Sequence, residues 1–205
     1  MRSLILTLAV LACTSVAHAA DLTVRVTSDA GAPVENAVIT FMPAVRPTGP
    51  IRFDWAYQVA QRNLQFEPYI LIVPVGAEVR FPNLDRVRHH VYSFSEGNRF
   101  ELELYGRDET RSRRFTTAGV AAVGCNIHDQ MQAYIVIVDT PFVGRTGADG
   151  SVVIRGASGA GELRVWHANL RARGGVMTRA VTLPATGAAQ QAFAVQLRAT
   201  AGHGH

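Results

Sequence analysis

The chain places apolar and polar residues alternately in short runs that end at glycine, proline, asparagine or aspartate. Residues 22–27 alternate strictly and residues 100–105 alternate again, which is typical of half-buried strands because successive side chains point to opposite faces. Similar runs predict further strands at residues 34–42, 69–73, 78–81, 89–94, 119–123, 133–138, 152–154, 163–167, 180–183 and 193–197. About ten short strands and almost no helical periodicity predict an all-β chain, either a sandwich or a barrel.

Three segments fit this pattern less clearly. In residues 51–65, Phe53, Ala56, Tyr57 and Ala60 fit a helical turn or two, whereas the end of the segment fits a strand. Residues 106–114 predict a polar loop, and residues 199–205 a loose tail. The arginines of the polar loop are expected to be solvated, with an acidic redox partner as the alternative; they are Arg107, Arg111, Arg113 and Arg114.

The start of the chain predicts export. A positive Arg2, an apolar run over residues 4–12 and the Ala17-His18-Ala19 site form a secretory signal peptide over residues 1–19. An alternative is a lipidated Cys13, against which the bulky Leu11 argues. We therefore expect a protein secreted to the periplasm, with no membrane span, because no second apolar stretch reaches about 18 residues.

Charge and cysteine usage narrow the chemistry. All 20 basic residues are arginine, and removing Arg2 with the signal peptide leaves 19 against 16 acidic residues, a net charge of +3. These arginines are scattered among acidic residues, so we expect no nucleic-acid partner. Cleavage also removes Cys13 and leaves Cys125 alone, so its thiol is free, pairs with another chain or binds a metal.

The segment Gly124-Cys125-Asn126-Ile127-His128-Asp129-Gln130-Met131 carries the strongest chemical signal. It spaces a thiolate, an imidazole and a thioether as Cys-x2-His-x2-Met, between two apolar runs. Sulfur ligands with imidazole select copper, and a cysteine, two histidines and a weak axial methionine form an electron-transfer copper site. Cys125, His128 and Met131 supply three of these ligands, and a second histidine must come from elsewhere in the chain.

Residues 61–139 resemble the cupredoxins, the blue or type 1 copper proteins such as amicyanin and plastocyanin. The resemblance rests on Phe66-x-Pro68, on Val73-Pro74-Val75-Gly76-x-x-Val79-x-Phe81-x-Asn83, on the His89 region and on the Cys125 loop, whose spacing is most similar to that of amicyanin. It implies a Greek-key β-sandwich that holds one type 1 Cu(I)/Cu(II) ion through His89, Cys125, His128 and Met131.

Two neighbouring histidines compete for the upstream ligand position. The spacing from Phe81 favours His89 and puts His90 where the family usually has an asparagine that braces the ligand loop. Strand alternation instead groups His90 with Tyr92 and Phe94. We predict His89 as the ligand, with His90 and Asn83 as bracing residues, or His90 as the alternative ligand. His167 is expected to be structural, and His203 and His205 to be solvated, with a weak accessory copper site in the tail as the alternative.

The flanks suggest a second module. Residues 20–43 and 143–198 resemble the two halves of a carboxypeptidase regulatory-like sandwich of transthyretin-like or Ig-like type, and a cupredoxin domain over residues 44–142 would be inserted between them. This layout resembles proteins described as methylamine-utilisation-type. The flank would then act in docking or as a scaffold.

These features predict an electron carrier rather than an enzyme, exchanging single electrons with periplasmic redox proteins such as a c-type cytochrome or a dehydrogenase. Alternatives are a copper-binding protein for delivery or buffering without redox turnover, and a structural adhesion module. Haem of the c type, binuclear copper and structural zinc all need more cysteines than the chain offers, and multicopper oxidases need repeated His-x-His clusters. A Cys125/His128 nucleophile lacks any accompanying oxyanion hole or substrate motif.

Overall fold

The computed structural model describes residues 20–199, which fold as an all-β protein with sixteen strands and one three-residue 3-10 helix, η1 (Arg173–Gly175). The fold class expected from the alternating pattern is confirmed. The predicted signal peptide and residues 200–205 of the predicted tail lie outside the described residues. Within residues 20–199, no helix is long and apolar enough to span a bilayer.

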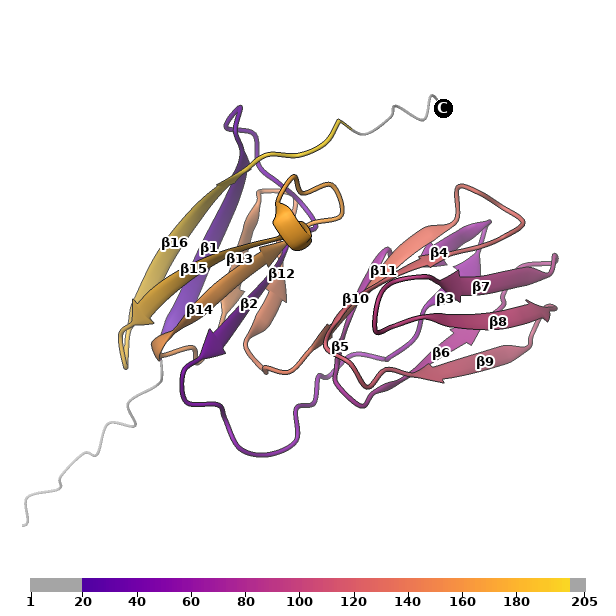
Figure 1. The fold of residues 1–205 in the computed structure, drawn as a ribbon, viewed down its shortest axis with the longest axis horizontal. Helices are drawn as coiled ribbons and strands as arrows, with labels where there is room; N and C mark the ends of the chain where they lie inside the picture. The colour runs from indigo at the N-terminus through magenta and orange to yellow at the C-terminus, as the bar shows by residue number, and fades with distance from the viewer. Residues whose placement is uncertain (1–19, 200–205) are drawn as a thin grey trace, which may run out of the picture.

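Strands from the two ends of the described chain form one pair of sheets (Figure 1). One sheet has the order β13-β1-β16, and the other has the order β12-β2-β14-β15. β1 pairs antiparallel with β13 and parallel with β16. The strands are β1 (Asp21–Ser28), β2 (Val38–Pro43), β12 (Val143–Arg145), β13 (Ser151–Ile154), β14 (Gly159–Trp166), β15 (Val176–Leu183) and β16 (Ala188–Val195).

Apolar side chains of both sheets share one buried core. Alternate residues of β1 are fully buried, which is what its strict apolar–polar alternation predicts for a strand with one face on a core. Phe41 of β2, Leu163 of β14 and Phe193 of β16 belong to the same cluster. We call this unit the terminal sandwich.

The intervening strands form the second unit, which we call the central sandwich. Its main sheet has the order β5-β11-β10-β7-β8, and two strand pairs, β3-β4 and β6-β9, complete it. The bounds are β3 (Ala60–Arg62), β4 (Gln65–Glu67), β5 (Ile70–Pro74), β6 (Glu78–Pro82), β7 (His89–Ser93), β8 (Phe100–Tyr105), β9 (Thr110–Arg114), β10 (Gly119–Gly124) and β11 (Gln132–Val138). Its core includes Phe81, Phe115, Cys125 and Met131.

A third apolar cluster joins the two sandwiches. Val38 of β2 lies in it with Ile70, Ile72, Val136 and Val138 of β5 and β11. Across the same contact, the rings of Tyr134 and Trp166 meet edge to face with centroids 5.2 Å apart. The two units therefore meet through buried apolar contacts in addition to their covalent connections.

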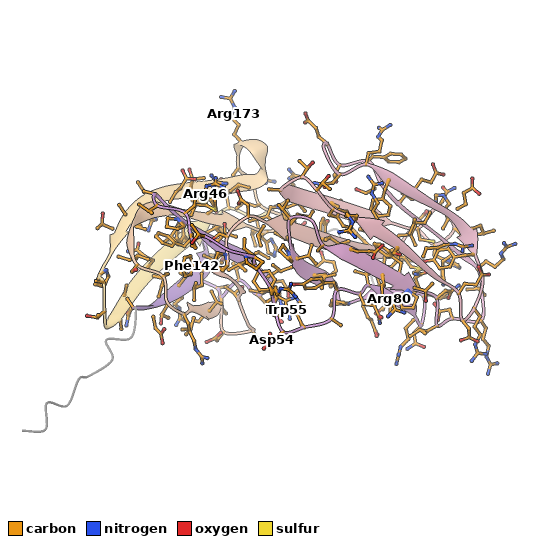
Figure 2. All side chains as sticks on the ribbon, turned by 90° about the horizontal axis from the view of Figure 1, so that it is seen from below. Arg46, Asp54, Trp55, Arg80, Phe142 and Arg173 are labelled. Atoms are coloured by element: carbon orange, nitrogen blue, oxygen red, sulfur yellow. The ribbon has the colours of Figure 1, made fainter. Side chains whose placement is uncertain are left out.

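The connection from β2 to β3 contacts the central sandwich through Trp55. Trp55 donates a hydrogen bond from Nε1 to the carbonyl of Ile72 at 2.8 Å, on the edge strand β5, and stacks on Phe53 with centroids 4.6 Å apart. Figure 2 shows Trp55 in the region where the two sandwiches meet. Arg46, near the start of this connection, forms an ion pair of 2.7 Å with Asp139, which follows β11.

Two local expectations were wrong. Residues 53–60 form no helical turn, since Phe53 and Trp55 instead stack on each other and the segment ends in the short strand β3. The predicted polar loop of residues 106–114 contains β9, whose side chains are all exposed. Its backbone pairs with β6, from Glu78 opposite Arg114 to Pro82 opposite Thr110, and backbone pairing does not require apolar side chains. Hydrophobic patterning alone cannot detect such a strand.

Candidate metal centre

Neighbouring strands bring the two parts of the site together. β10 ends at Gly124 and β11 begins at Gln132, so residues 125–131 form the loop that joins two paired strands. β7 lies on the other side of β10, with Tyr92 opposite Gly124, and starts at His89. The sheet order β11-β10-β7 therefore places His89 beside the Cys125 loop, although 36 positions separate His89 from Cys125.

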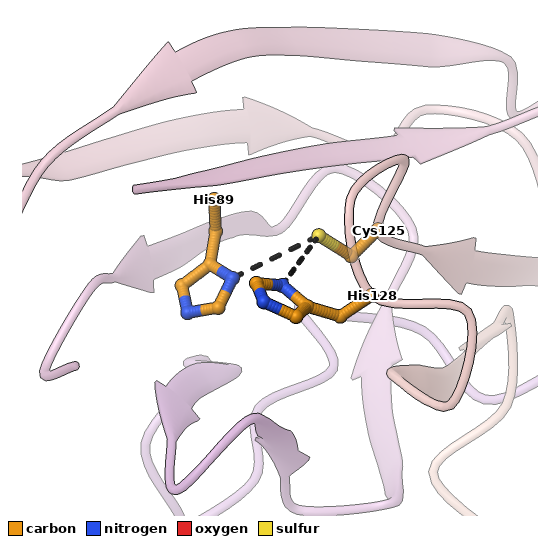
Figure 3. A group of neighbouring side chains, drawn as sticks. All are labelled: His89, Cys125 and His128. Carbon is orange, nitrogen blue, oxygen red and sulfur yellow. Dashed lines mark hydrogen bonds between the residues drawn. The ribbon is translucent and has the colours of Figure 1, made fainter. Parts of the chain in front are cut away.

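Three donor atoms converge at this point (Figure 3). Nδ1 of His89 lies 3.8 Å from Sγ of Cys125, and Nδ1 of His128 lies 4.0 Å from the same sulfur. All three atoms lie within 4.8 Å of one another, and no other group of three or more histidine, cysteine or acidic side chains in residues 20–199 is close enough to hold a metal. His89 and Cys125 are buried, whereas His128 is partly exposed.

These residues fit a soft metal ion. A thiolate and an imidazole that share one ion at about 2.3 and 2.0 Å lie no more than about 4.3 Å apart, and both sulfur–nitrogen separations satisfy this limit. A single thiolate with two imidazoles is also the donor set that copper electron-transfer sites use. The side chains could therefore hold copper within the observed fold.

The predicted fourth ligand lies at the end of the same loop. Met131 is 1% exposed and belongs to the same core cluster as Cys125. Its backbone N–H donates to the carbonyl of His128 at 2.9 Å, which closes the loop in a tight turn. The side chain thus belongs to the buried region around Cys125, and its coordination of a metal stays a prediction.

His90 points to a different environment. Its Nε2 lies 2.8 Å from Oε1 of Glu101 on β8, a carboxylate that is 68% exposed. In β7, residues 89, 91 and 93 are the buried ones, so His90 is on the opposite face from His89. The face that His90 shares with Tyr92 is therefore the less buried one, and the core face of β7 carries His89. Which of the two histidines binds a metal stays a prediction.

Asn83 braces the segment that leads into His89. Its Nδ2 donates to the carbonyls of Val87 and Tyr105 at 2.8 and 3.1 Å, and its Oδ1 accepts from the N–H of Asp85 at 2.9 Å. Asn83 is fully buried, so these bonds replace water for every polar atom of its side chain. They fix the turn over residues 83–88 and hence the position of the following histidine.

Asp85 carried no signal in the sequence that marked it as part of the site. Its Oδ2 lies 2.9 Å from Nε2 of His89, on the side of the ring that faces away from Cys125. Burial raises the pKa of this carboxyl, but hydrogen bonds from the backbone of Leu64, from His89 and from the backbone of Asn63 outweigh that effect, and the pKa lies below its ordinary value. The spacing Asp-x3-His was visible, but a four-residue separation in a turn does not by itself predict contact.

His167 lies outside the centre, as expected from its sequence context. It follows β14 of the terminal sandwich, and its Nδ1 accepts a hydrogen bond from the N–H of Asn169 at 3.2 Å. Burial lowers its pKa, so the neutral ring is favoured.

A buried polar network supports the strand that carries the site. Tyr105, which lies opposite His89 in the β7–β8 pair, donates from its hydroxyl to the carbonyl of Phe81 at 2.9 Å and accepts from Gln61. Burial raises the pKa of Tyr105 to about 12, which the hydrogen bond from Gln61 opposes only in part. The folded protein therefore holds this phenol in its neutral form.

The raised pKa predicts a loss of stability in alkali. The phenol ionises near pH 10 when unfolded but near 12 when folded, so its contribution is complete below pH 10 and is lost as pH rises toward 12. We expect the free energy of unfolding to fall by on the order of 2 kcal/mol for this group over that interval. Urea titrations from about pH 9 to 12 would measure it. Tyr105→Phe should show a shallower decline, and an equal decline in both proteins would contradict the assignment.

Comparisons with known proteins give structural similarity only. No protein-family model matches the chain, and no curated protein matches it. Among solved structures, it is similar to the copper-containing nitrite reductase (NirK) from Thermus scotoductus SA-01, with 24% identity over 46% of this chain and 25% of that chain and a TM-score of 0.39. The chain thus spans about a quarter of that enzyme.

Two smaller proteins are matched along nearly their whole length. The purple cupredoxin from Nitrosopumilus maritimus is 20% identical over 40% of this chain and 98% of that chain, with a TM-score of 0.37. A reduced amicyanin variant is 22% identical over 51% of this chain and 100% of that chain, with a TM-score of 0.38. Part of this all-β chain is thus similar to solved cupredoxins, at TM-scores below 0.4.

Proposed function

We propose that this protein is a mononuclear type 1 copper protein that carries single electrons between partners in the periplasm and transforms no substrate. The observation that carries the proposal is the convergence of the His89 and His128 Nδ1 atoms on the Cys125 sulfur, at 3.8 and 4.0 Å. Copper bound there would supply the one-electron Cu(I)/Cu(II) couple. We assign His89, Cys125 and His128 as ligands, with Met131 as the weak axial ligand.

The protein would contribute a fixed and nearly dry set of donors. His89 and Cys125 are buried in a close-packed β-sandwich, so their positions cannot follow a change in the charge of the ion. Met131 lies in the same core and closes the loop through its hydrogen bond to His128. One geometry that serves both oxidation states keeps reorganisation small, which is what fast electron transfer needs.

The exposed edge of His128 is the proposed route for electrons. Ile127 beside it is 51% exposed, and Leu64, Leu84 and Val87 are exposed apolar residues on the turns next to His89 and Asp85. Exposed apolar side chains near the site suit a brief protein–protein contact. A c-type cytochrome or a dehydrogenase of the periplasm is the kind of partner we propose.

For the domain layout, we propose a cupredoxin domain over residues 44–142 inserted into a carboxypeptidase regulatory-like sandwich of residues 20–43 and 143–198. The pairing of β2 with β12, on either side of the inserted segment, supports this division. Because the described part of the terminal sandwich has no metal-binding cluster of its own, a docking or scaffold role suits it best.

The decisive experiment is a Cu(II) titration of the purified protein from residue 20 onward, followed by visible absorption. We expect one equivalent of copper to give an intense thiolate-to-copper charge-transfer band that a reductant bleaches reversibly. Cys125→Ser should abolish the band, whereas His167→Ala, a histidine outside the centre, should keep it.

Two outcomes would refute electron carriage. Tight Cu(I) binding without a coloured Cu(II) form would indicate copper delivery or buffering. The absence of copper binding would leave a structural module.

A further inference from the structure

Both adjacent histidines of β7 pair with a carboxylate, but only one pair is buried. Nε2 of His89 lies 2.9 Å from Oδ2 of Asp85, and the two side chains are 0% and 11% exposed. Nε2 of His90 lies 2.8 Å from Oε1 of Glu101, where the exposures are 14% and 68%. The protein thus contains two imidazole–carboxylate contacts of nearly the same length in different surroundings.

The Asp85 carboxylate is also held from the other side. Its Oδ1 accepts from the N–H of Asn63 at 2.6 Å, and its Oδ2 accepts from the N–H of Leu64 at 3.1 Å. These two residues form the turn between β3 and β4 and have left-handed φ values of 51° and 58°. With its own N–H bonded to Asn83, Asp85 has little freedom to turn away from His89.

We propose that Asp85 is a positioning residue for the metal ligand His89: it holds the ring proton on Nε2, leaves the Nδ1 lone pair directed at the metal position beside Cys125, and favours Cu(II) over Cu(I). The preference for Cu(II) over Cu(I) rests on the proposed function. The position of the ring proton is a property of the metal-free protein and does not depend on that function.

The direction of the effect follows from the charges. A carboxylate that accepts a hydrogen bond from the far nitrogen of an imidazole makes the near nitrogen a stronger donor. A stronger donor stabilises the ion of higher charge more, and the buried setting leaves little water to screen the carboxylate. Asp85 should therefore lower the reduction potential of bound copper.

Asp85→Asn tests this effect, with Glu101→Gln as the matched control. Asparagine keeps one acceptor oxygen, which can serve the N–H of Asn63 or that of Leu64 but not both, and removes the charge beside His89. We expect its Cu(II) affinity to fall about tenfold relative to its Cu(I) affinity, which equals a rise of about 60 mV in potential. Glu101→Gln should leave the potential at the wild-type value, because His90 faces away from the centre. Redox titrations monitored by the copper absorption would measure both.

Nitrogen-15 NMR of the metal-free wild-type protein supplies a readout that needs neither copper nor a variant. We expect the His89 ring to carry its proton on Nε2, with a slowly exchanging signal. A ring protonated on Nδ1 alone would overturn the proposal. An Asp85→Asn potential equal to that of wild type would overturn the charge effect while leaving the electron-carrier function intact. If the wild-type protein bound no copper, the proposed function would fail and the NMR result would still decide the role of Asp85.

Discussion

Replacing His89 with glutamine should weaken copper binding by at least about 100-fold, whereas replacing His90 with glutamine should change it by less than about threefold. Loss of a residue that only supports a ligand costs about 10- to 100-fold in metal affinity, and loss of the ligand itself should cost at least as much. His89 directs Nδ1 at the Cys125 sulfur from 3.8 Å, whereas His90 contacts the exposed Glu101 instead.

Competition with a copper chelator would measure both affinities, with circular dichroism to verify that each variant folds. The visible band reports on the same change, because a site reduced to Cys125, His128 and Met131 should lose the geometry that gives intense colour. Equal effects of the two substitutions, or a larger effect at His90, would reject His89 as the ligand.

The second large effect concerns folding. Phe193→Ala should lower the free energy of unfolding by about 3–5 kcal/mol, the usual cost of truncating a fully buried aromatic side chain. Phe193 is 1% exposed in the core of the terminal sandwich, and the guanidinium of Arg179 covers its ring at 4.1 Å. Copper affinity should stay within about twofold of wild type, because no residue of the metal centre belongs to that core.

Phe115→Ala is the matched substitution in the other core. Phe115 is also 1% exposed, and it packs edge to face on Phe100 in the cluster that contains Cys125 and Met131. We expect a similar loss of stability, accompanied by weaker copper binding. Denaturant titrations followed by tryptophan fluorescence and by the copper band would compare the two variants. A loss of copper affinity in Phe193→Ala as large as in Phe115→Ala would contradict two separate cores.

The interface between the sandwiches limits how independently the two units can unfold. Val38, Val136, Val138 and the Tyr134–Trp166 contact bury apolar surface from both units, so destabilising one unit also exposes part of the other. The two unfolding transitions should therefore overlap even where the cores are separate. The metal affinity, which depends on local geometry, separates the two variants more sharply than stability does.

Strand periodicity and the spacing of the loop ligands could be predicted from the sequence, because both depend only on residues close together in the chain. Strict alternation in residues 22–27 corresponds to β1, because the two faces of a strand meet different surroundings. Residues 100–105 form β8, where the alternation ends at Leu104, which is exposed, and Tyr105, which is buried. The Cys-x2-His-x2-Met spacing brought Cys125 and His128 to one short loop for the same reason: residues three apart in a turn cannot be far apart in space. Its similarity to cupredoxins could also be seen from these motifs.

The features that the sequence could not decide depend on pairing between distant strands. For the adjacent His89 and His90, the spacing from Phe81 favoured His89 and strand alternation favoured His90. Only the structure shows that the core face of β7 carries His89 beside Cys125. In the sequence, Asp85 has the properties of an ordinary turn residue. In the structure it lies between His89 and the β3–β4 turn and contacts both. β9 carries no apolar signal, and its pairing with β6 became visible only in the sheet.

By itself, then, the chain determined an all-β fold and three neighbouring candidate ligands, because short-range spacing and side-chain periodicity are properties of the local backbone. The tertiary structure decided which imidazole completes the cluster, which carboxylate holds that imidazole and how the two sandwiches meet. Those choices depend on register and burial, which arise only when strands separated by tens of residues form one sheet.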